Sequence, residues 1–424
     1  MGNLAINGGN PIRDTKINPW PKWPVWDEKE EKGLLQVLHS GIWSYNGPQE
    51  VEFNRSFAQF IGTKYALAAA NGTITLQLAL EACGIGIGHE VIVPGLTWQA
   101  TATTIADVNA VPVLVDVCED TWCINPDEIV KAITAKTRAI IPVHLYGNMA
   151  DMDTILDIAK RHNLKVIEDC AHKHGGAWNS KKAGSMGDAG SFSFQLSKLL
   201  TAGEGGALTT NDPVLYEKLD ALRNCGRRPS RQEEIDKGAG VYHDEGNFIQ
   251  SGNYRITDFQ AVLLLEGLKK LPQQNKLREE NAAYLNTLLA QLPGILPMRS
   301  DERETQKAYY NFSLRYDKNE FKDLPTEKFR EALGEELGCT VEPSYEPLNN
   351  CALYKPQTKP SRYKIDERHW QEIDPTRFSL PVCEKIFHEQ SVCFHHSVLM
   401  GDKNDLEMIA DAINKIYKYT EELL

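Results

Sequence analysis

The sequence predicts an α/β fold. A large domain holds a seven-stranded, mixed but mainly parallel sheet between helices, and a smaller C-terminal α+β domain follows it. Short β-favouring runs alternate with helical patterns from Tyr65 to Thr210, which is typical of parallel sheets. From about Pro293 the pattern changes, and short strand-like segments such as 310–316 are interleaved with helices.

The seven strands are expected at residues 65–70, 90–94, 111–117, 138–144, 164–169, 191–195 and 206–210. Helical patterns lie between most of them, at residues 73–83, 97–108, 126–132 and 151–163. The last two strands have no helix between them. We therefore expect one strand of this pair to run antiparallel to the rest.

Further helices are expected on both sides of this alternating region. An amphipathic helix at 27–39 precedes a loop at 40–51, and a helix at 213–223 follows the last strand. A long helix starts at Thr257, and Pro272 is expected to interrupt it, with a second helix running on to about residue 292. The small domain is expected to contain helices at 326–337 and 406–423.

We divide the chain into an N-terminal arm at 1–27, a large domain at 28–275 and a small domain at 276–424. The arm interleaves three tryptophans with three prolines between Asn18 and Trp26, so it cannot form a regular helix. We expect the tryptophans to pack onto the body of the protein or onto a partner subunit. A less favoured alternative is that the arm roofs an active site.

Composition excludes several classes of protein. The 424 residues carry a net charge of −12, which argues against nucleic acid or an anionic membrane as the main partner. Nine cysteines occur without paired spacing, so neither a zinc site nor a disulfide framework is indicated. The N-terminus lacks the pattern of a signal peptide, and no apolar run approaches the roughly 20 residues needed to span a bilayer. We expect a cytoplasmic protein.

The strongest chemical signal is Lys198. It lies between two β-favouring runs, before the glycine-rich turn at 203–206, and its near neighbours are apolar or small and uncharged. A lysine in such surroundings can lose its proton and form a Schiff base, which indicates pyridoxal phosphate (PLP). An ordinary solvated lysine is the alternative.

PLP also requires an acid beside its pyridinium nitrogen, because the ring accepts electrons only while that nitrogen is protonated. Asp169 directly follows a buried run, at the end of a strand where α/β sheets bind ligands. We interpret Asp169 as this partner. The alternative is a helix N-cap.

Four more residues are candidates for holding the cofactor. Gly72 and Thr73 open a helix directly after a strand, where free backbone amides favour a phosphate, and Ser193 could add a hydroxyl. Trp98 follows the next strand and could lie flat on a pyridine ring. The alternatives are a plain turn capped by Thr73, a simple strand residue and a core tryptophan.

Two remaining segments carry polar groups without a clear role. The glycine-rich, charged stretch at 224–252 contains Arg227 and Arg228, which could bind an anionic substrate or a neighbouring subunit, although solvated charge is the commoner explanation. His395 and His396 are adjacent on a strand-like segment and point to opposite faces, and no nearby carboxylate or cysteine pattern supports a metal site.

The order of the motifs is more specific than any single motif. The chain resembles the StrS-type (DegT/DnrJ/StrS) sugar aminotransferases over nearly its whole length. The motifs that carry the resemblance are NGT at 71–73, TW at 97–98, VIEDCAH at 166–172, FSFQLSK at 192–198, AGEGGA at 202–207 and GNYR at 252–255. The resemblance implies a PLP enzyme of the aspartate aminotransferase fold (fold type I) that works as a homodimer.

The resemblance also implies residue roles. Lys198 would form the Schiff base with PLP and move the proton, Asp169 would pair with the pyridinium nitrogen, and Trp98 would stack on the ring. His172 stands where many relatives have a glutamine that contacts the cofactor's hydroxyl group.

The same resemblance assigns the phosphate to residues of both subunits. Gly72, Thr73 and Ser193 would hold it from one subunit, and Asn253 would reach it from the other. The active sites would then be shared across the dimer interface.

Within the family, the HKHG at 172–175 and the HHSVLM at 395–400 look closest to two subgroups. Inosose (ketocyclitol) aminotransferases move an amino group from glutamine or glutamate to a cyclic ketone in aminocyclitol and antibiotic biosynthesis. The 3-amino-5-hydroxybenzoate synthases use PLP to dehydrate and aromatise a ring. A nucleotide-linked keto-sugar substrate and a non-catalytic protein with the same fold are further alternatives.

Overall fold

The computed structural model describes residues 2–227 and 248–424. Its central sheet has seven strands in the order β1-β9-β8-β5-β4-β2-β3, which confirms all seven predicted strands. They are β1 (Tyr65–Ala69), β2 (Glu90–Pro94), β3 (Val111–Val115), β4 (Thr137–Ile140), β5 (Lys165–Asp169), β8 (Ala189–Ser193) and β9 (Gly206–Thr210).

Only β9 runs against the other strands of this sheet, because it is antiparallel to both β1 and β8 whereas the remaining pairs are parallel. The predicted antiparallel pair is therefore confirmed. As a result the carboxyl ends of β1, β2, β5 and β8 share one edge of the sheet, where open α/β sheets bind ligands.

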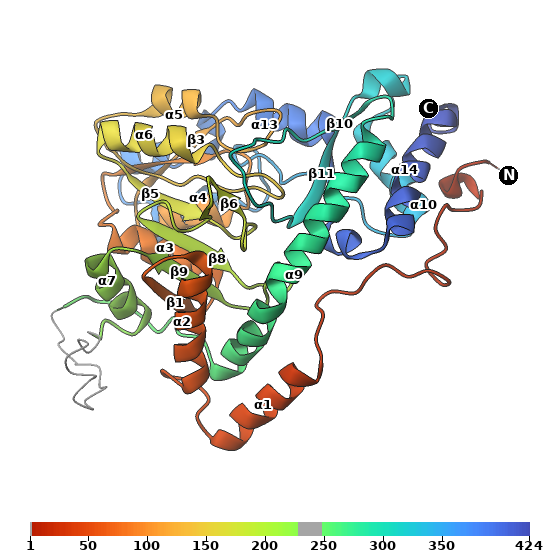
Figure 1. The fold of residues 1–424 in the computed structure, drawn as a ribbon. Coiled ribbons are helices and arrows are strands. Elements are labelled where there is room, and N and C mark those ends of the chain that lie inside the picture. Colours follow the sequence, from red (N-terminus) through yellow and green to blue (C-terminus); the bar gives the residue numbers. More distant parts are fainter. Residues whose placement is uncertain (1, 228–247) are drawn as a thin grey trace.

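Helices connect and cover the strands, as Figure 1 shows. The predicted helices recur with ends shifted by up to three residues: α1 (Glu28–Ser40), α3 (Gly72–Ala82), α4 (Ala100–Asp107), α5 (Pro126–Ala132), α6 (Met152–His162) and α7 (Pro213–Arg223). Among the described helices longer than ten residues, one was not expected. The segment at 48–51, predicted as loop, opens α2 (Pro48–Ile61), in which Pro48 occupies the first turn, where a missing N–H costs nothing.

The prediction that Pro272 separates two helices is wrong. A single helix, α9 (Asp258–Leu289), contains Pro272 and runs along the length of the molecule (Figure 1). Proline inside a helix costs about 3 kcal/mol. Leucines buried on both sides of it, Leu268 and Leu271 before and Leu285 and Leu289 after, outweigh that cost at about 1.5–3 kcal/mol each.

A second, three-stranded sheet follows, with β11 (Asn311–Tyr316) between β10 (Ile295–Pro297) and β12 (Ser391–His395). The helices α10 (Thr326–Leu337) and α14 (Lys403–Lys418) pack with it around a core that includes Phe312, Phe329, Leu333 and Ile413. The helix predicted at 406–423 thus begins and ends earlier. The predicted domain boundary at residue 275 falls inside α9 and stays a prediction.

Smaller elements complete the described part of the chain. They are the two-stranded β6 (Ala177–Trp178) and β7 (Lys181–Lys182), and the short helices α11 (Pro360–Tyr363), α12 (Glu367–Glu372) and α13 (Pro381–Lys385). Among the described helices, none combines the length and the apolar character needed to cross a membrane.

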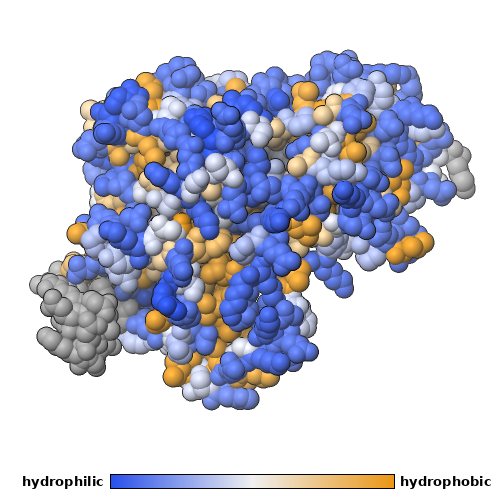
Figure 2. All heavy atoms as spheres, in the orientation of Figure 1, coloured by the Kyte–Doolittle hydropathy of each residue, from blue (hydrophilic) through white to orange (hydrophobic). Residues whose placement is uncertain are grey.

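Two tryptophans of the N-terminal arm bind to the body of the protein. The indole of Trp20 donates a hydrogen bond to the carbonyl oxygen of Leu337, and that of Trp23 donates to the carbonyl oxygen of Leu196. The following helix α1 packs against α9 at the lower edge of the view in Figure 1. Apolar surface gathers around α1 and α2 on the face seen in Figure 2. Large exposed apolar side chains of this region are Trp26, Leu35, Leu38, Ile42, Trp43 and Val51.

Candidate active site

Lys198 lies on the loop between β8 and β9, at the ligand-binding edge of the large sheet. Its side chain is buried, and its Nζ lies 4.1 Å from the ring centroid of Tyr310. Burial lowers the pKa of Lys198 to about 8, although the negative charge of Asp169 acts in the opposite direction. An amine with such a pKa is partly neutral near physiological pH, as a nucleophile must be.

Asp169 ends β5, next to β8, with Ser191 as its partner in the parallel register. The hydroxyl of Thr101 donates a hydrogen bond to its Oδ2 at 3.0 Å, and the backbone N–H of Ala171 donates to its Oδ1 at 3.2 Å. Burial raises the pKa of Asp169, while those two hydrogen bonds and the charge of Lys198 oppose the rise. The structure therefore brings Lys198 and Asp169 into one buried site.

Gly72 and Ser193 lie against each other at the same edge. Gly72 is the first residue of α3, and a Cβ atom there would lie 2.7 Å from the Cβ of Ser193, so only glycine fits. Asn71 caps the helix by accepting a hydrogen bond from the N–H of Ile74, and Thr73 is exposed in the first turn. The helix N-terminus and the Ser193 hydroxyl together offer donors for an anion.

Trp98 is not a core residue, because 45% of it is exposed. It follows β2, and its ring lies 5.6 Å from that of Tyr345. The alternative of a core tryptophan is thereby excluded. Its position at the open side of the site is compatible with contact to a bound ring.

His172 is buried in a group of aromatic rings. Its ring stacks on Tyr310 with centroids 3.9 Å apart, and it also lies parallel to the ring of Tyr146. Its Nδ1 accepts a hydrogen bond from the N–H of Tyr146 at 3.4 Å, and its Nε2 lies 3.2 Å from the hydroxyl of Tyr345. Burial holds the pKa of His172 well below its usual value, so the imidazole is neutral.

Other sequence candidates lie elsewhere. Asn253 pairs with Asn224 in an isolated β-bridge, and within residues 2–227 and 248–424 no hydrogen bond or ring contact joins it to the candidates above. Arg227 lies 5.9 Å from the ring of Tyr45. Arg228 lies outside the described residues.

The prediction that His395 and His396 point to opposite faces of one strand is wrong, because His395 ends β12, His396 follows it in a 3-10 helix, and their rings lie 4.2 Å apart. His396 is buried, and its Nε2 lies 3.1 Å from the carbonyl oxygen of Ser197, next to Lys198. The Nδ1 of His395 instead lies 2.9 Å from the hydroxyl of Ser397. His396 therefore helps to fix the loop that carries Lys198.

A separate buried group contains His144, Glu168 and Cys170. Glu168 accepts hydrogen bonds from the N–H groups of Gly184, Met186 and Gly187, and also contacts His144 Nε2 at 3.2 Å. These contacts occupy both carboxylate oxygens of Glu168. We therefore interpret the group as one that holds the loop before β8 in place.

Four residues of the site escaped the sequence analysis: Thr101, Tyr146, Tyr310 and Tyr345. Thr101 lies four residues after Thr97 at the start of α4, and their hydroxyls are 3.0 Å apart, so helical spacing offered a signal. Tyr310 and Tyr345 come from segments far along the chain, and nothing in their local sequence indicates that they meet Lys198 and His172.

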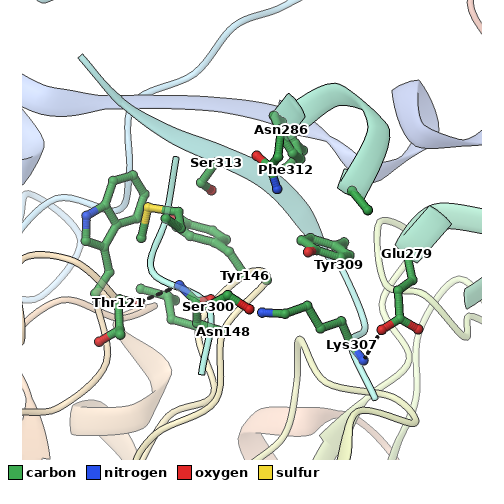
Figure 3. A pocket seen from close by; sticks show the side chains of 15 residues that line it. Thr121, Tyr146, Asn148, Glu279, Asn286, Ser300, Lys307, Tyr309, Phe312 and Ser313 are labelled. Carbon is green, nitrogen blue, oxygen red and sulfur yellow. Dashed lines mark hydrogen bonds between the residues drawn. The ribbon is translucent and has the colours of Figure 1, made fainter. Parts of the chain in front are cut away.

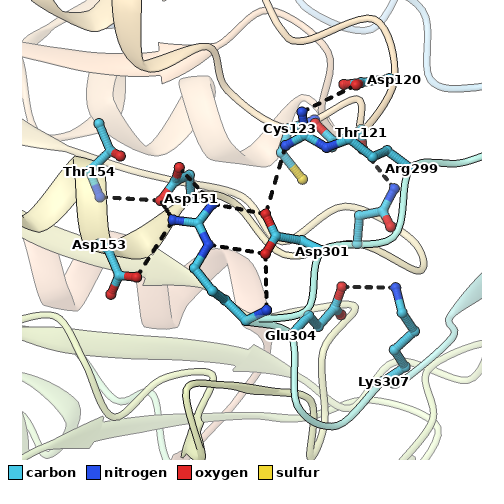
Figure 4. A network of polar contacts seen from close by, with 12 residues as sticks. Asp120, Thr121, Cys123, Asp151, Asp153, Thr154, Arg299, Asp301, Glu304 and Lys307 are labelled. Carbon is cyan, nitrogen blue, oxygen red and sulfur yellow. Dashed lines mark hydrogen bonds and ion pairs between the residues drawn. The ribbon is translucent and has the colours of Figure 1, made fainter.

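Ion pairs fix the segment that leads to Tyr310. Arg303 binds Asp301 and Asp151, and Arg299 binds Asp120, in the network that Figure 4 shows. Glu304 pairs with Lys307 at 3.1 Å. It also pairs with the fully buried Lys173 at 2.6 Å, so this segment is anchored to the residue next to His172.

A cavity of about 320 Å³ is lined by Tyr146, Tyr309 and Lys307, among other residues (Figure 3). Its described lining includes none of the residues predicted to hold PLP. Lys198 and Asp169, rather than this cavity, therefore define the candidate active site.

Comparison with known proteins agrees with this geometry. The model of the DegT/DnrJ/EryC1/StrS aminotransferase family matches residues 24–394. The chain is 42% identical to an L-glutamine:2-deoxy-scyllo-inosose aminotransferase of Streptoalloteichus tenebrarius, over 99% of both chains. It is 39% identical to an L-glutamine:scyllo-inosose aminotransferase of Streptomyces griseus, again over 99% of both.

A solved structure supports the fold. The crystal structure of a 3-amino-5-hydroxybenzoic acid synthase superposes with a TM-score of 0.78 at 30% identity, and the match covers 93% of this chain and 98% of the synthase.

Proposed function

The chain belongs to the DegT/DnrJ/EryC1/StrS aminotransferase family, and on that premise we propose that it transfers an amino group from glutamine to a cyclic ketone of the inosose type. The observation that carries the proposal is the buried pair of Lys198 and Asp169, in a chain 39–42% identical to two inosose aminotransferases over almost its full length. The pathway would be aminocyclitol or antibiotic biosynthesis.

The residues present fit PLP. Asp169 is a buried carboxylate that can pair with a protonated ring nitrogen, and α3 with Ser193 offers donors for a phosphate. Bound there, PLP would supply an aldehyde for amines and a ring that accepts electrons from a carbon losing its proton. Trp98 would cover the ring. His172 remains a predicted cofactor contact, although both of its nitrogens already have partners.

The proposed roles of the other site residues are proton transfer, positioning and the exclusion of water. Lys198, partly neutral near pH 8, would take a proton from the α-carbon of the amino donor. In the second half of the reaction it would give a proton to the ring carbon that gains the amino group. Thr101 keeps the carboxylate of Asp169 in place. The aromatic rings around His172 would exclude water from the reacting carbon.

The amino donor and acceptor follow from the relatives. Both are named for L-glutamine as donor and for an inosose as acceptor. The main alternative is dehydration and aromatisation, as in the 3-amino-5-hydroxybenzoate synthases, but that structural match is only 30% identical. A nucleotide-linked keto-sugar is a further alternative acceptor.

A cytoplasmic homodimer would complete the enzyme. The exposed apolar side chains on and beside α1, such as Trp26, Leu35 and Trp43, offer a surface for a second copy. In the described part of the structure, no hydrogen bond or ring contact joins Asn253 to the candidate residues of its own chain. We propose that it reaches the phosphate of the partner's site.

The test is an assay of the purified protein with PLP, glutamine and either 2-deoxy-scyllo-inosose or scyllo-inosose, with product analysis by mass spectrometry. The proposal predicts an aminated ring, and Lys198→Ala should abolish it while Lys181→Ala, at an exposed lysine, should not. An aromatic product, or amination of nucleotide-linked keto-sugars alone, would contradict the proposal.

A further inference from the structure

Tyr310 contacts both Lys198 and His172. The Lys198 amine lies over the Tyr310 ring at 4.1 Å from the centroid, and the same ring stacks on the imidazole of His172 at 3.9 Å with an interplanar angle of 17°. An ammonium group over an aromatic face is attracted by the ring, most strongly where water is excluded. Tyr310 therefore offers the free lysine amine a defined place.

The hydroxyl of Tyr310 also holds the lysine loop. It lies 2.8 Å from the Oγ of Ser197, the residue before Lys198. Ser197 in turn donates its proton to the Oε1 of Gln195 at 2.7 Å, so Tyr310 must be the donor to Ser197. The ring and the hydroxyl of one residue thus act on neighbouring positions of the loop.

A directed chain of hydrogen bonds leads from Tyr146 through His172 to Tyr345, whose hydroxyl neighbours Tyr310. Because Nδ1 of His172 accepts from the N–H of Tyr146, its proton is on Nε2 and is donated to the hydroxyl oxygen of Tyr345. Burial raises the pKa of Tyr310, and the neighbouring hydroxyl of Tyr345 acts against that rise. The backbone of Tyr345 is held by the hydroxyl of Tyr146 at 3.0 Å.

We propose that Tyr310 is the positioning residue of Lys198: its ring face receives the amine whenever the amine is not bonded to the cofactor, and its hydroxyl fixes the loop. This inference rests on the proposed role of Lys198. It requires that the ring stabilises the protonated amine, so that losing the ring makes the amine easier to deprotonate.

The experiment mixes cofactor-free protein rapidly with PLP and follows the visible absorbance of lysine-bound cofactor from pH 6 to 10. The rate should rise with pH as the Lys198 amine loses its proton, with a midpoint near 8 in the wild type. Removing the ring in Tyr310→Leu should lower the midpoint by about one pH unit. Tyr310→Phe keeps the ring and should keep the midpoint. Its amino transfer should nevertheless be slower, because the hydroxyl that holds the lysine loop is missing.

Matched controls separate this effect from others. Tyr309→Phe changes the neighbouring tyrosine, which lines the cavity of Figure 3, and should leave the curve unchanged. The other titratable groups that face the amine, Asp169, His172 and His174, are the same in every variant. Should Tyr310→Leu lose its fold, judged by circular dichroism, Tyr310→Met removes the aromatic face with a more adaptable side chain.

An unchanged midpoint in the folded Tyr310→Leu or Tyr310→Met variant would overturn the inference while leaving the proposed function intact. A wild-type protein that forms no such absorbance, or a Lys198→Ala variant that forms it as well, would instead overturn the assignment of Lys198 and with it this inference.

Discussion

The hydroxyl of Thr101 donates a hydrogen bond to the carboxylate of Asp169 at 3.0 Å, from the first turn of α4 to the end of β5. Within residues 2–227 and 248–424, the other neutral donor to this buried acid is the N–H of Ala171. A carboxylate that is to hold a proton on a ring nitrogen needs such partners, because burial alone favours its neutral form.

Replacing Thr101 with valine should therefore weaken the site without changing its shape. The lost hydrogen bond to a charged group corresponds to about 1.5–3 kcal/mol, or roughly 10- to 100-fold in kcat/KM for amino transfer. Steady-state kinetics would measure this. Thr103→Val, a partly exposed threonine on the same helix, is the control and should stay within twofold of the wild type.

Gly72→Ala should reduce PLP affinity at least tenfold, because the new methyl group would meet the Cβ of Ser193 at 2.7 Å and displace the start of α3 from the phosphate. Fluorescence titration of the cofactor-free protein with PLP measures the affinity. Gly86→Ala, where a Cβ comes no closer than 3.6 Å to its neighbours, should bind normally. Equal affinities in the two variants would remove Gly72 from the phosphate site.

Removal of the Lys173 amine should destabilise the fold. Lys173→Met removes the 2.6 Å partner of the buried Glu304 carboxylate and leaves it with Lys307 at 3.1 Å, so the loss should lie at or below the about 3–5 kcal/mol of a fully broken buried ion pair. Urea unfolding would show this loss. The double variant Lys173→Met, Glu304→Gln should recover part of it, since the buried carboxylate that lost its nearest partner is then neutral, and a double variant as unstable as the single one would argue against the ion pair as the cause.

Stability should fall in mild acid because buried histidines are held neutral. Burial lowers the pKa of His174 to about 3 and that of His172 and His396 well below the ordinary value. The unfolded chain binds their protons below about pH 6.5 and the folded chain does not, so unfolding becomes easier as pH falls. Each such histidine should cost about 2 kcal/mol between pH 6.5 and 5.

The pH effect can be assigned with His174→Gln, which should lose less stability between pH 6.5 and 5 than the wild type does. His39→Gln, at an exposed histidine, should follow the wild-type curve. Urea unfolding at both pH values provides the comparison, and identical pH slopes for His174→Gln and the wild type would show that His174 is not held neutral.

The sheet could be predicted from the sequence because each strand is a short buried run between turn residues, and all seven were located within a few residues. The continuity of α9 could not, because the local effect of Pro272 is overcome by leucines that pack against distant parts of the chain. The start of α2 was missed since Gly47 and Pro48 are as typical of a loop as of a helix start.

The site residues also fall into those that the sequence could predict and those that it could not. Lys198, Asp169, Gly72 and Ser193 lie in local motifs at strand ends, and the structure brings all four to one edge of the sheet. Thr101 acts on a residue 68 positions away, and Tyr345 on one 173 positions away. Such contacts depend on how the chain folds back on itself, which spacing within a motif does not reveal.

The central claim is that the amine of Lys198 binds the cofactor. Reduction of the PLP-loaded protein with borohydride, followed by peptide mass spectrometry, tests it directly, because reduction makes the lysine–cofactor bond permanent. We predict the cofactor mass on the peptide that contains Lys198 and on no other. A cofactor attached to a different lysine, or no attachment at all, would contradict the account.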